Sequence, residues 1–329
     1  MTTNANNAPQ PLVSFIVTYY NLPVSLLCSC IDSILALSLE PDEREIIVID
    51  DGSDLSPMND LLKYSDDIVY VRQKNAGVSV SRNKAMDMAR GKYIQLLDGD
   101  DCLLTAPYNF CLDILRKHSD ADVVSFDFTH QADSAVTSFN APVRKNGTDM
   151  MRNENIHGSA CCYIFSQSVR GQLAFTPGIA YGEDEEFTPQ LLIRAESVYT
   201  TDVQAYFYRE RETSAIHLAD DASIEKRLNN TREVILRLNK LADRSPQRDK
   251  LALRRRVAQL TMDYIYNTIL LTRSERKFAD AISDFQNIGL FPLPNHPYSA
   301  KYTWFRRLSN NAIGRKILFT AIPLMKKER

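Results

Sequence analysis

The chain has 329 residues, more than one average domain, and its hydrophobic (44%) and charged (24%) fractions are those of an ordinary globular protein. The formal net charge of -2 gives no general attraction for nucleic acid, so we expect no nucleic-acid partner. No stretch approaches the roughly 18 apolar residues of a membrane span, and residues 1–11 lack the pattern of a secretory signal. We therefore expect a cytoplasmic protein whose residues 1–11 are disordered.

Strands and helices alternate in the first hundred residues. Short apolar runs rich in β-branched side chains predict strands at 12–19, 45–49, 68–72 and 93–97. Apolar residues at helical spacing predict helices at 24–39, 58–64 and 80–90. This alternation predicts a mostly parallel α/β sheet covered by helices, with ligands bound beyond the carboxyl ends of the strands.

The second half of the chain is less regular and then helical. A helix at 108–118 and a strand at 122–128 are followed by a polar stretch, 129–155, where we expect strands to turn antiparallel. Further elements are predicted as strands at 158–166 and 198–208, and as helices at 183–195, 224–242 and 248–271. The domains are predicted as a catalytic domain over 12–216 and a helical region over 217–329.

The last stretch, 301–329, contains eight basic residues, a single acid, Glu328, and interleaved aromatic and aliphatic side chains. A segment of this kind can lie on an anionic membrane surface, here the inner face of the cytoplasmic membrane. A final helix packed on the protein with a solvated basic face explains the same pattern equally well. Elsewhere, six cysteines occur without a Cys-x-x-Cys pair, and we expect reduced, mostly buried thiols, including the vicinal Cys161 and Cys162.

Three acidic side chains, Asp98, Asp100 and Asp101, follow one of the predicted strands. Carboxylates this close repel one another, and a divalent cation with oxygen ligands relieves that repulsion. The pattern suits Mg²⁺ or Mn²⁺ bridging a diphosphate, although acidic triplets also occur on surfaces by chance. A second pair, Asp50 and Asp51, follows another strand and can contact a base or ribose, or form a capping turn.

Two other segments carry candidate chemistry. Glycine at the Asn75-Ala76-Gly77 turn precedes a helix with Arg82, which suits a diphosphate contact or an ordinary capped helix. Four acids, residues 183–186, begin a later helix and supply either a general base or helix capping. The cations of 208–211 follow a strand, where they can neutralise a diphosphate, and His217 is a weak ligand candidate.

Taken in order, these segments resemble the bacterial family 2 glycosyltransferases of capsule, exopolysaccharide and lipopolysaccharide synthesis, which have the GT-A fold. The matching motifs are VSFIVTYYN, IIVIDDGS, NAGVSVSRN, YIQLLDGDD, YGEDEEF and YFYRERETSAI, which together cover about residues 12–216. Thr18 stands where many members have Pro, and Ser81 replaces the usual Ala. The order of the motifs is far more specific than any one of them.

The resemblance implies roles for donor-binding residues. Thr18, Tyr20 and Asp51 would bind the nucleoside. Arg82 would lie near the diphosphate, and Asp98 would face the ribose.

The resemblance also implies the chemistry of an inverting glycosyltransferase. Asp100 would ligate Mn²⁺ or Mg²⁺, and Asp184 would take the proton from the acceptor hydroxyl of a glycan or a lipid-linked acceptor. The expected donor is a nucleotide sugar, of the UDP-sugar type, and the chain lacks the Q-x-x-R-W signature of polymerising members, which implies single additions. Accessory roles are expected for Asn21, Asp50, Asp101, Glu183, Arg211 and His217.

Other functions are weighed against this one. A sugar-nucleotide pyrophosphorylase would carry glycines after its first strand, where this chain has Val17 to Asn21 without one. A phospho-acceptor receiver domain places its acids after the first and third strands, and here they follow the second and fourth. A catalytically inactive sugar-nucleotide-binding relative stays open, although Asp100 and Asp184 are both present.

Overall fold

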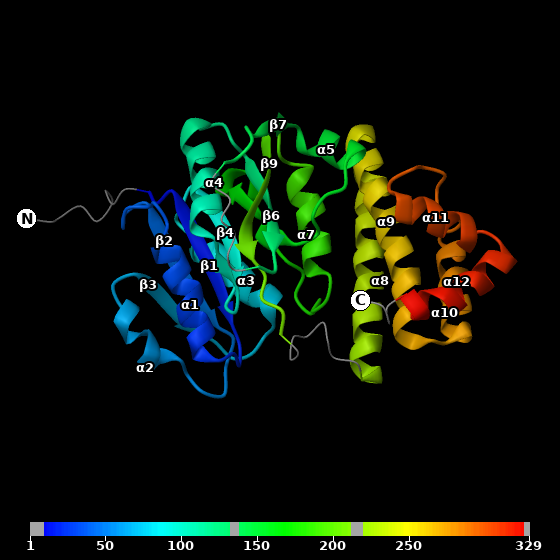
Figure 1. The fold of residues 1–329 in the computed structure, drawn as a ribbon, viewed down its shortest axis with the longest axis horizontal. Coiled ribbons are helices and arrows are strands. Elements are labelled where there is room, and N and C mark those ends of the chain that lie inside the picture. Colours follow the sequence, from blue (N-terminus) through cyan, green and yellow to red (C-terminus); the bar gives the residue numbers. More distant parts are fainter. Residues whose placement is uncertain (1–9, 132–137, 212–219, 326–329) are drawn as a thin grey trace, which may run out of the picture. The chain divides into compact units, whose positions relative to one another are not determined.

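The computed structural model describes residues 10–131, 138–211 and 220–325, and its chain divides into two compact units (Figure 1). The first, here called the sheet unit, comprises residues 1–147, 157–179 and 190–211. The second, the helical unit, comprises residues 148–156, 180–189 and 212–329. The predicted boundary at residues 216 and 217 and most of the predicted disordered segment, residues 1–11, lie outside the described residues, so both stay predictions.

One sheet of nine strands forms the centre of the sheet unit within the described residues, in the order β3-β2-β1-β4-β8-β6-β9-β5, with β7 paired to β9. Its strands are β1 (Val13–Tyr19), β2 (Arg44–Asp50), β3 (Ile68–Arg72), β4 (Tyr93–Asp98), β5 (Cys102–Leu103), β6 (Val123–Thr129), β7 (Val143–Lys145), β8 (Tyr163–Ser166) and β9 (Val198–Phe207). The first four are parallel, whereas β8 runs antiparallel to β4 and β6. The predicted parallel α/β half and the expected antiparallel turn are confirmed.

Helices cover the strands as the alternation predicted, and the sheet core is apolar. These helices are α1 (Val24–Leu35), α2 (Met58–Leu61), α3 (Val78–Met88), α4 (Thr105–Lys117) and α6 (Gln167–Arg170). Strand β1 is buried along almost its whole length because helices pack on a parallel sheet from both faces. One prediction is wrong in part: residues 160–162 form a 3₁₀ turn, so the strand predicted from 158 begins at Tyr163. All six cysteines are free and four of them are buried.

A network of hydrogen bonds links the amino-terminal ends of β1, β2 and β4. The buried Glu45 carboxylate accepts from Ser14 Oγ (2.5 Å), from Arg90 N (2.7 Å) and from Arg90 Nε (2.7 Å). Burial alone would raise the pKa of Glu45, but these hydrogen bonds outweigh it and hold the pKa below its ordinary value. Gly91 is required beside this network, because a Cβ there would lie 2.6 Å from Ser14 N.

The helical unit is built from long, amphipathic helices, which confirms the predicted helical C-terminal region. They are α5 (Gly147–Asn153), α7 (Glu183–Leu192, shared with the sheet unit), α8 (Asp221–Arg244), α9 (Gln247–Thr272), α10 (Glu275–Asn287), α11 (Ala300–Ser309) and α12 (Ala312–Met325). A bidentate ion pair joins α8 to α10, with Arg232 Nε and Nη2 at 2.5 and 2.9 Å from the Asp284 carboxylate. Among the described residues, no helix combines the length and the hydropathy that crossing a membrane requires.

Candidate active site

The acid loop, residues 98–101, leaves the carboxyl end of β4 beside the end of β1. Thr18 and Asp98 are register partners, and Gly99 N donates to Thr18 O at 2.9 Å. A Cβ on Gly99 would lie only 2.8 Å from that carbonyl oxygen, closer than real Cβ atoms come to a neighbour. The motif therefore needs glycine here for a steric reason, which is the close approach of the loop to β1.

Asp98 is held by a buried arginine. Arg82 of α3 is only 3% exposed, and its Nη2 lies 2.9 Å from Asp98 Oδ1. Its guanidinium also lies over the Phe175 ring, 5.2 Å from the ring centroid, and Thr18 Oγ1 donates weakly to Asp98 Oδ1 at 3.4 Å. The structure thus joins three of the predicted donor-binding residues, Thr18, Arg82 and Asp98, in one contact group.

Asp100 forms an ion pair with an arginine that follows β9. Arg211 Nε lies 2.6 Å from Asp100 Oδ2, and Arg209 Nε donates to the Asp100 carbonyl oxygen at 2.8 Å. Burial and the nearby Asp98 charge raise the pKa of Asp100, and Arg211 opposes that shift. Arg211 therefore neutralises the carboxylate that the motif assigns to a metal ion.

Asp101 is fixed by hydrogen bonds from β9 and from the residues that follow it. It is 1% exposed and accepts hydrogen bonds from Tyr206 Oη (2.7 Å) and Arg209 N (2.8 Å). Tyr206 Oη in turn accepts from Asp98 N at 3.2 Å. Burial, followed by the Asp98 charge, raises the pKa of Asp101 to about 8. Strand β9 therefore fixes the shape of the acid loop through side chains far away in sequence.

The second acidic pair serves two neighbouring loops. Asp50 is fully buried and accepts from Ser53 N (2.9 Å) and Tyr70 Oη (2.8 Å). Asp51 accepts from Ala76 N (2.9 Å) and Gly77 N (2.8 Å), which ties the end of β2 to the turn before α3. Both carboxylates thus have a structural task, whatever the ligand they also meet.

The residues after β1 form the rim of the same strand ends. Asn21 has a left-handed backbone (φ 48°), and its side chain and Asp54 exchange hydrogen bonds of 3.2 and 2.8 Å. The backbone N–H of Asn21 also donates to Ser53 Oγ at 3.0 Å, so Asn21 links the loops that follow β1 and β2. The neighbouring Tyr20 is 48% exposed, which leaves its ring available to a ligand.

The acid loop suits a divalent ion that the substrate helps to bind. In the part of the chain that the structure describes, no three His, Cys, Asp or Glu side chains converge as a metal-binding group. Mg²⁺ in nucleotide enzymes is commonly bound by one or two carboxylates together with substrate phosphates. A half-buried carboxylate with a raised pKa, Asp100, beside a second acid, Asp98, fits that incomplete ligand set.

In the helical unit, the four acids at the start of α7 fall into two pairs. Glu186 Oε1 lies 2.6 Å from Arg237 Nε of α8, and Glu185 pairs with Arg256 of α9. These two acids hold the helix on its neighbours. Glu183 and Asp184, the two with predicted roles, are half-buried in the first turn after Gly182, which has φ 80°. His217 lies outside the described residues.

Sequence reasoning missed Tyr206, which touches both Asp98 and Asp101, and Gln73, whose Nε2 donates to Asp51 at 2.8 Å. Gln73 lies outside the quoted motifs, and Tyr206, the first residue of YFYRERETSAI, was given no role. Tyr206 stands at an inward-facing position of a predicted strand, but no local pattern shows which loop its hydroxyl reaches.

Known proteins similar to this chain are glycosyltransferases. It is 28% identical over 233 residues to the uncharacterized glycosyltransferase EpsJ of Bacillus subtilis, covering 66% of this chain and 67% of that one. It is 26% identical over 208 residues to the minor teichoic acid biosynthesis protein GgaB of B. subtilis, covering 60% of this chain but only 23% of GgaB.

Solved structures show the fold. The S. aureus TarS 1–349 complex with UDP-GlcNAc has a TM-score of 0.66 at 16% identity, covering 96% of this chain and 91% of that one. The Pyrobaculum calidifontis mannosyltransferase PcManGT, in complex with GDP-Man and Mn²⁺, has a TM-score of 0.56 at 15% identity, covering 99% and 91%. The predicted GT-A fold is confirmed. The resemblance to the family 2 glycosyltransferases is confirmed, because residues 14–169, just under half of the chain, match the family model described as Glycosyl transferase family 2.

Proposed function

We propose that the protein is an inverting, metal-dependent transferase that moves one sugar from a nucleotide sugar of the UDP-sugar type to the hydroxyl of a glycan or lipid-linked acceptor. The observation that carries the proposal is the acid loop at the carboxyl ends of β1 and β4. There, two carboxylates, Asp98 and Asp100, are each paired with an arginine. In such a site the carboxylates would hold a divalent cation and the arginines would meet a diphosphate.

Donor binding is assigned to residues around the same strand ends. Thr18, Tyr20 and Asp51 bind the nucleoside, with the exposed Tyr20 ring able to stack on a base. Asp98 accepts from the ribose, and Arg82 beside it contributes positive charge toward the diphosphate. The buried position of Arg82 means that little side-chain entropy is lost when it binds.

Asp100 is assigned as the ligand of Mn²⁺ or Mg²⁺. When bound, the metal stabilises the negative charge of the departing nucleoside diphosphate as a Lewis acid. Arg211 pairs with Asp100 at 2.6 Å, and its charge would be available to the diphosphate if Asp100 held the cation. Asp101, held by Tyr206 and the Arg209 amide, keeps the loop in shape.

Asp184 is assigned as the general base that accepts the proton of the acceptor hydroxyl as that oxygen attacks the anomeric carbon. The helix dipole favours the ionised form of an acid in the first turn of α7. Glu183 is its accessory neighbour. A cytoplasmic role in bacterial surface-polysaccharide synthesis agrees with the motif resemblance and with the name of GgaB.

The test measures metal binding and turnover separately. Mn²⁺ titration calorimetry in the presence of saturating UDP should show binding to the parent protein, none to Asp100→Asn, and binding tightened several-fold in Arg211→Gln, because the internal competitor is gone. Equal Mn²⁺ affinity in all three proteins would reject the metal assignment.

Turnover is followed as release of nucleoside diphosphate from a panel of nucleotide sugars with Mn²⁺. Asp100→Asn should reduce release at least about 100-fold. Asp184→Asn should keep donor binding, seen as a ligand-dependent rise in melting temperature, while losing transfer. Donor binding lost in Asp184→Asn, or transfer retained there, would contradict its assignment as the base. Asp113→Asn, at a 54% exposed side chain of α4, is the control.

A further inference from the structure

Helix α12 turns an apolar stripe toward solvent. Ile313, Ile317 and Leu324 are 76%, 48% and 60% exposed, and their spacing places them on one face of the helix. The opposite face, with Leu318 and Ile322, is fully buried. Single exposed aliphatic residues are ordinary, but an exposed row of them opposite a buried face is not explained by packing in this unit.

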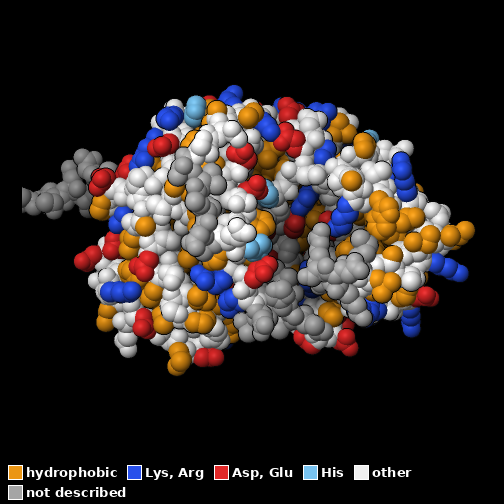
Figure 2. All heavy atoms as spheres, viewed as in Figure 1, with side chains coloured by type: hydrophobic (Ala, Val, Ile, Leu, Met, Phe, Trp, Pro, Cys, Tyr) orange, Lys and Arg blue, Asp and Glu red, His pale blue; other side chains and the backbone are white. Residues whose placement is uncertain are grey.

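The same region is strongly basic. Residues 300–325 contain no Asp or Glu and five basic residues: Lys301, Arg306, Arg307, Arg315 and Lys316. Lys301 is engaged inside the unit, because its Nζ lies 2.9 Å from Asp263 of α9. Figure 2 shows hydrophobic side chains gathered over the α11 and α12 region, with Lys and Arg at its margins. Trp304, 39% exposed, adds an aromatic ring of the type that favours membrane interfaces.

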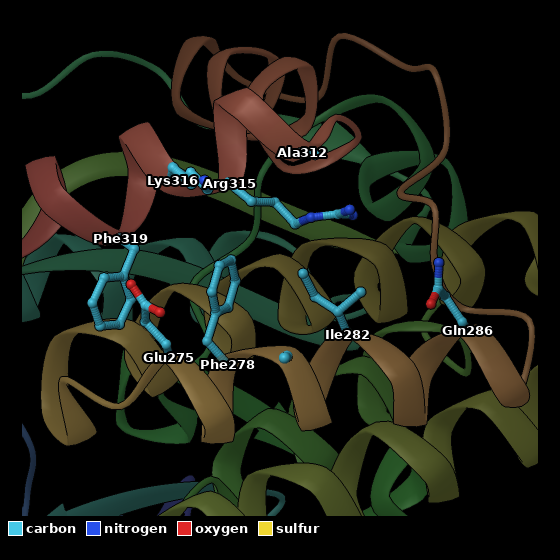
Figure 3. A pocket seen from close by; sticks show the side chains of 9 residues that line it. Glu275, Phe278, Ile282, Gln286, Ala312, Arg315, Lys316 and Phe319 are labelled. Carbon is cyan, nitrogen blue, oxygen red and sulfur yellow. The ribbon is translucent and has the colours of Figure 1, made fainter.

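A groove of about 410 Å³ lies beside this stripe, between α10 and α12 (Figure 3). Its apolar lining includes Phe278 and Ile282 from α10 and Phe319 from α12, with the two phenylalanine rings stacked 6.4 Å apart. Arg315 extends from α12 along the groove, and Lys316 lies on the same helix. Glu275 is the acid among the lining residues, so the charged lining is net positive.

We propose that the outward face of α12 and the adjoining groove dock on a bilayer that contains anionic phospholipid. Ile313, Ile317 and Leu324 enter the boundary between headgroups and acyl chains, and Lys316 and Arg315 bind phosphate oxygens. The groove accommodates part of an acyl chain over Phe278 and Phe319. An apolar face beside basic residues is the arrangement that combines hydrophobic insertion with attraction to an anionic leaflet. This surface lies wholly within the helical unit and requires no part of the proposed reaction.

The first test is vesicle flotation of the full-length protein with phosphatidylcholine vesicles containing 30% phosphatidylglycerol, about a third of the lipid being anionic. The double variant Ile313→Ser, Ile317→Ser should bind about tenfold or more weaker, since each inserted side chain contributes more than a factor of about three. Leu251→Ser, at a 46% exposed position of α9, is the matched control and should bind as the parent does. An equal loss in the control, or none in the double variant, would overturn the proposal.

The second test changes charge. Lys316→Glu should weaken binding at least about fivefold and reduce its salt dependence, whereas Lys240→Glu on α8 should not. Vesicles of pure phosphatidylcholine should bind little of any protein. If the parent instead forms a concentration-dependent dimer in light scattering, and the double variant does not, the face is a self-association surface and the membrane proposal fails. Donor turnover without vesicles should be unchanged in both variants, which separates this test from that of the proposed activity.

Discussion

The two ends of the same strands carry opposite kinds of acidic site. At the amino-terminal edge, Glu45 is buried with its charge fully matched by hydrogen bonds, and its pKa is lowered. At the carboxyl ends of the strands, Asp101 is buried and Asp100 half-buried, both beside the Asp98 charge, and their pKa values are raised. The contrast teaches that burial alone does not decide the ionisation of an acid; the hydrogen-bond donors and charges around it set the direction of its pKa shift.

The largest difference between the two strand ends is expected from two glycine variants, Gly99→Ala and Gly91→Ala. Gly99→Ala should push the acid loop off Thr18 O, and a displacement of that order should lower donor turnover about 100-fold. Gly91→Ala, which collides with Ser14 N at the other edge, should lower the melting temperature and leave Mn²⁺ affinity unchanged. Steady-state kinetics and calorimetry on both variants check this. If both variants lose turnover to the same extent, the two edges are not functionally distinct.

Removing the Glu45 carboxylate should lower the stability of the protein and leave its activity unchanged. Glu45→Ala leaves the Ser14 hydroxyl and the Arg90 amide without their acceptor, and should cost about 2 kcal/mol in free energy of unfolding at pH 7. Because the folded-state pKa is lowered, this contribution is present above the unfolded pKa and is lost as the pH falls through the folded pKa. Urea unfolding should therefore show a smaller difference near pH 3.5 than at pH 7. A difference that grows with acidity would be inconsistent with the network.

The smallest effect is expected at Asp101. Its folded-state pKa of about 8 lies above the unfolded value, so folding stability declines as the pH rises from about 4 to 8. Asp101→Asn can accept from the Arg209 amide and donate to Tyr206 Oη without a charge. It should raise the free energy of unfolding by about 1 kcal/mol at pH 8.5 and by less at pH 5. Gains of equal size at both pH values would argue against a raised pKa.

Much of the fold was predictable because its signals are local. Continuous apolar runs that end at turn residues mark β1 to β4, and these strands lie where the sequence predicts them. Strand β5, of two residues, and helix α10 were not predicted. Strand β5 exists because Cys102 and Leu103 pair with Phe207 and Tyr206, and no local pattern carries that information.

The positions of the candidate acids were also predictable from local signals. These acids stand in motifs next to strand ends, so their meeting at one end of the sheet follows from the parallel topology. The side chains that adjust those acids come from far away: Arg211 is 111 residues from Asp100, and Tyr206 is 105 residues from Asp101. Their charge and hydrogen bonds decide the pKa values, so a motif identifies the acids and the tertiary structure determines their ionisation.

The Tyr206 hydroxyl sets a lower limit on the size of a working enzyme fragment. A protein cut after residue 169, where the matching family region ends, would contain every carboxylate of the acid loop but neither β9 nor the arginines that follow it. Asp101 would lose both hydrogen-bond donors, and Asp100 would lose its counter-ion. Shortened or chimeric enzymes built on this fold should therefore take residues 14–169 and residues 198–211 from a single parent.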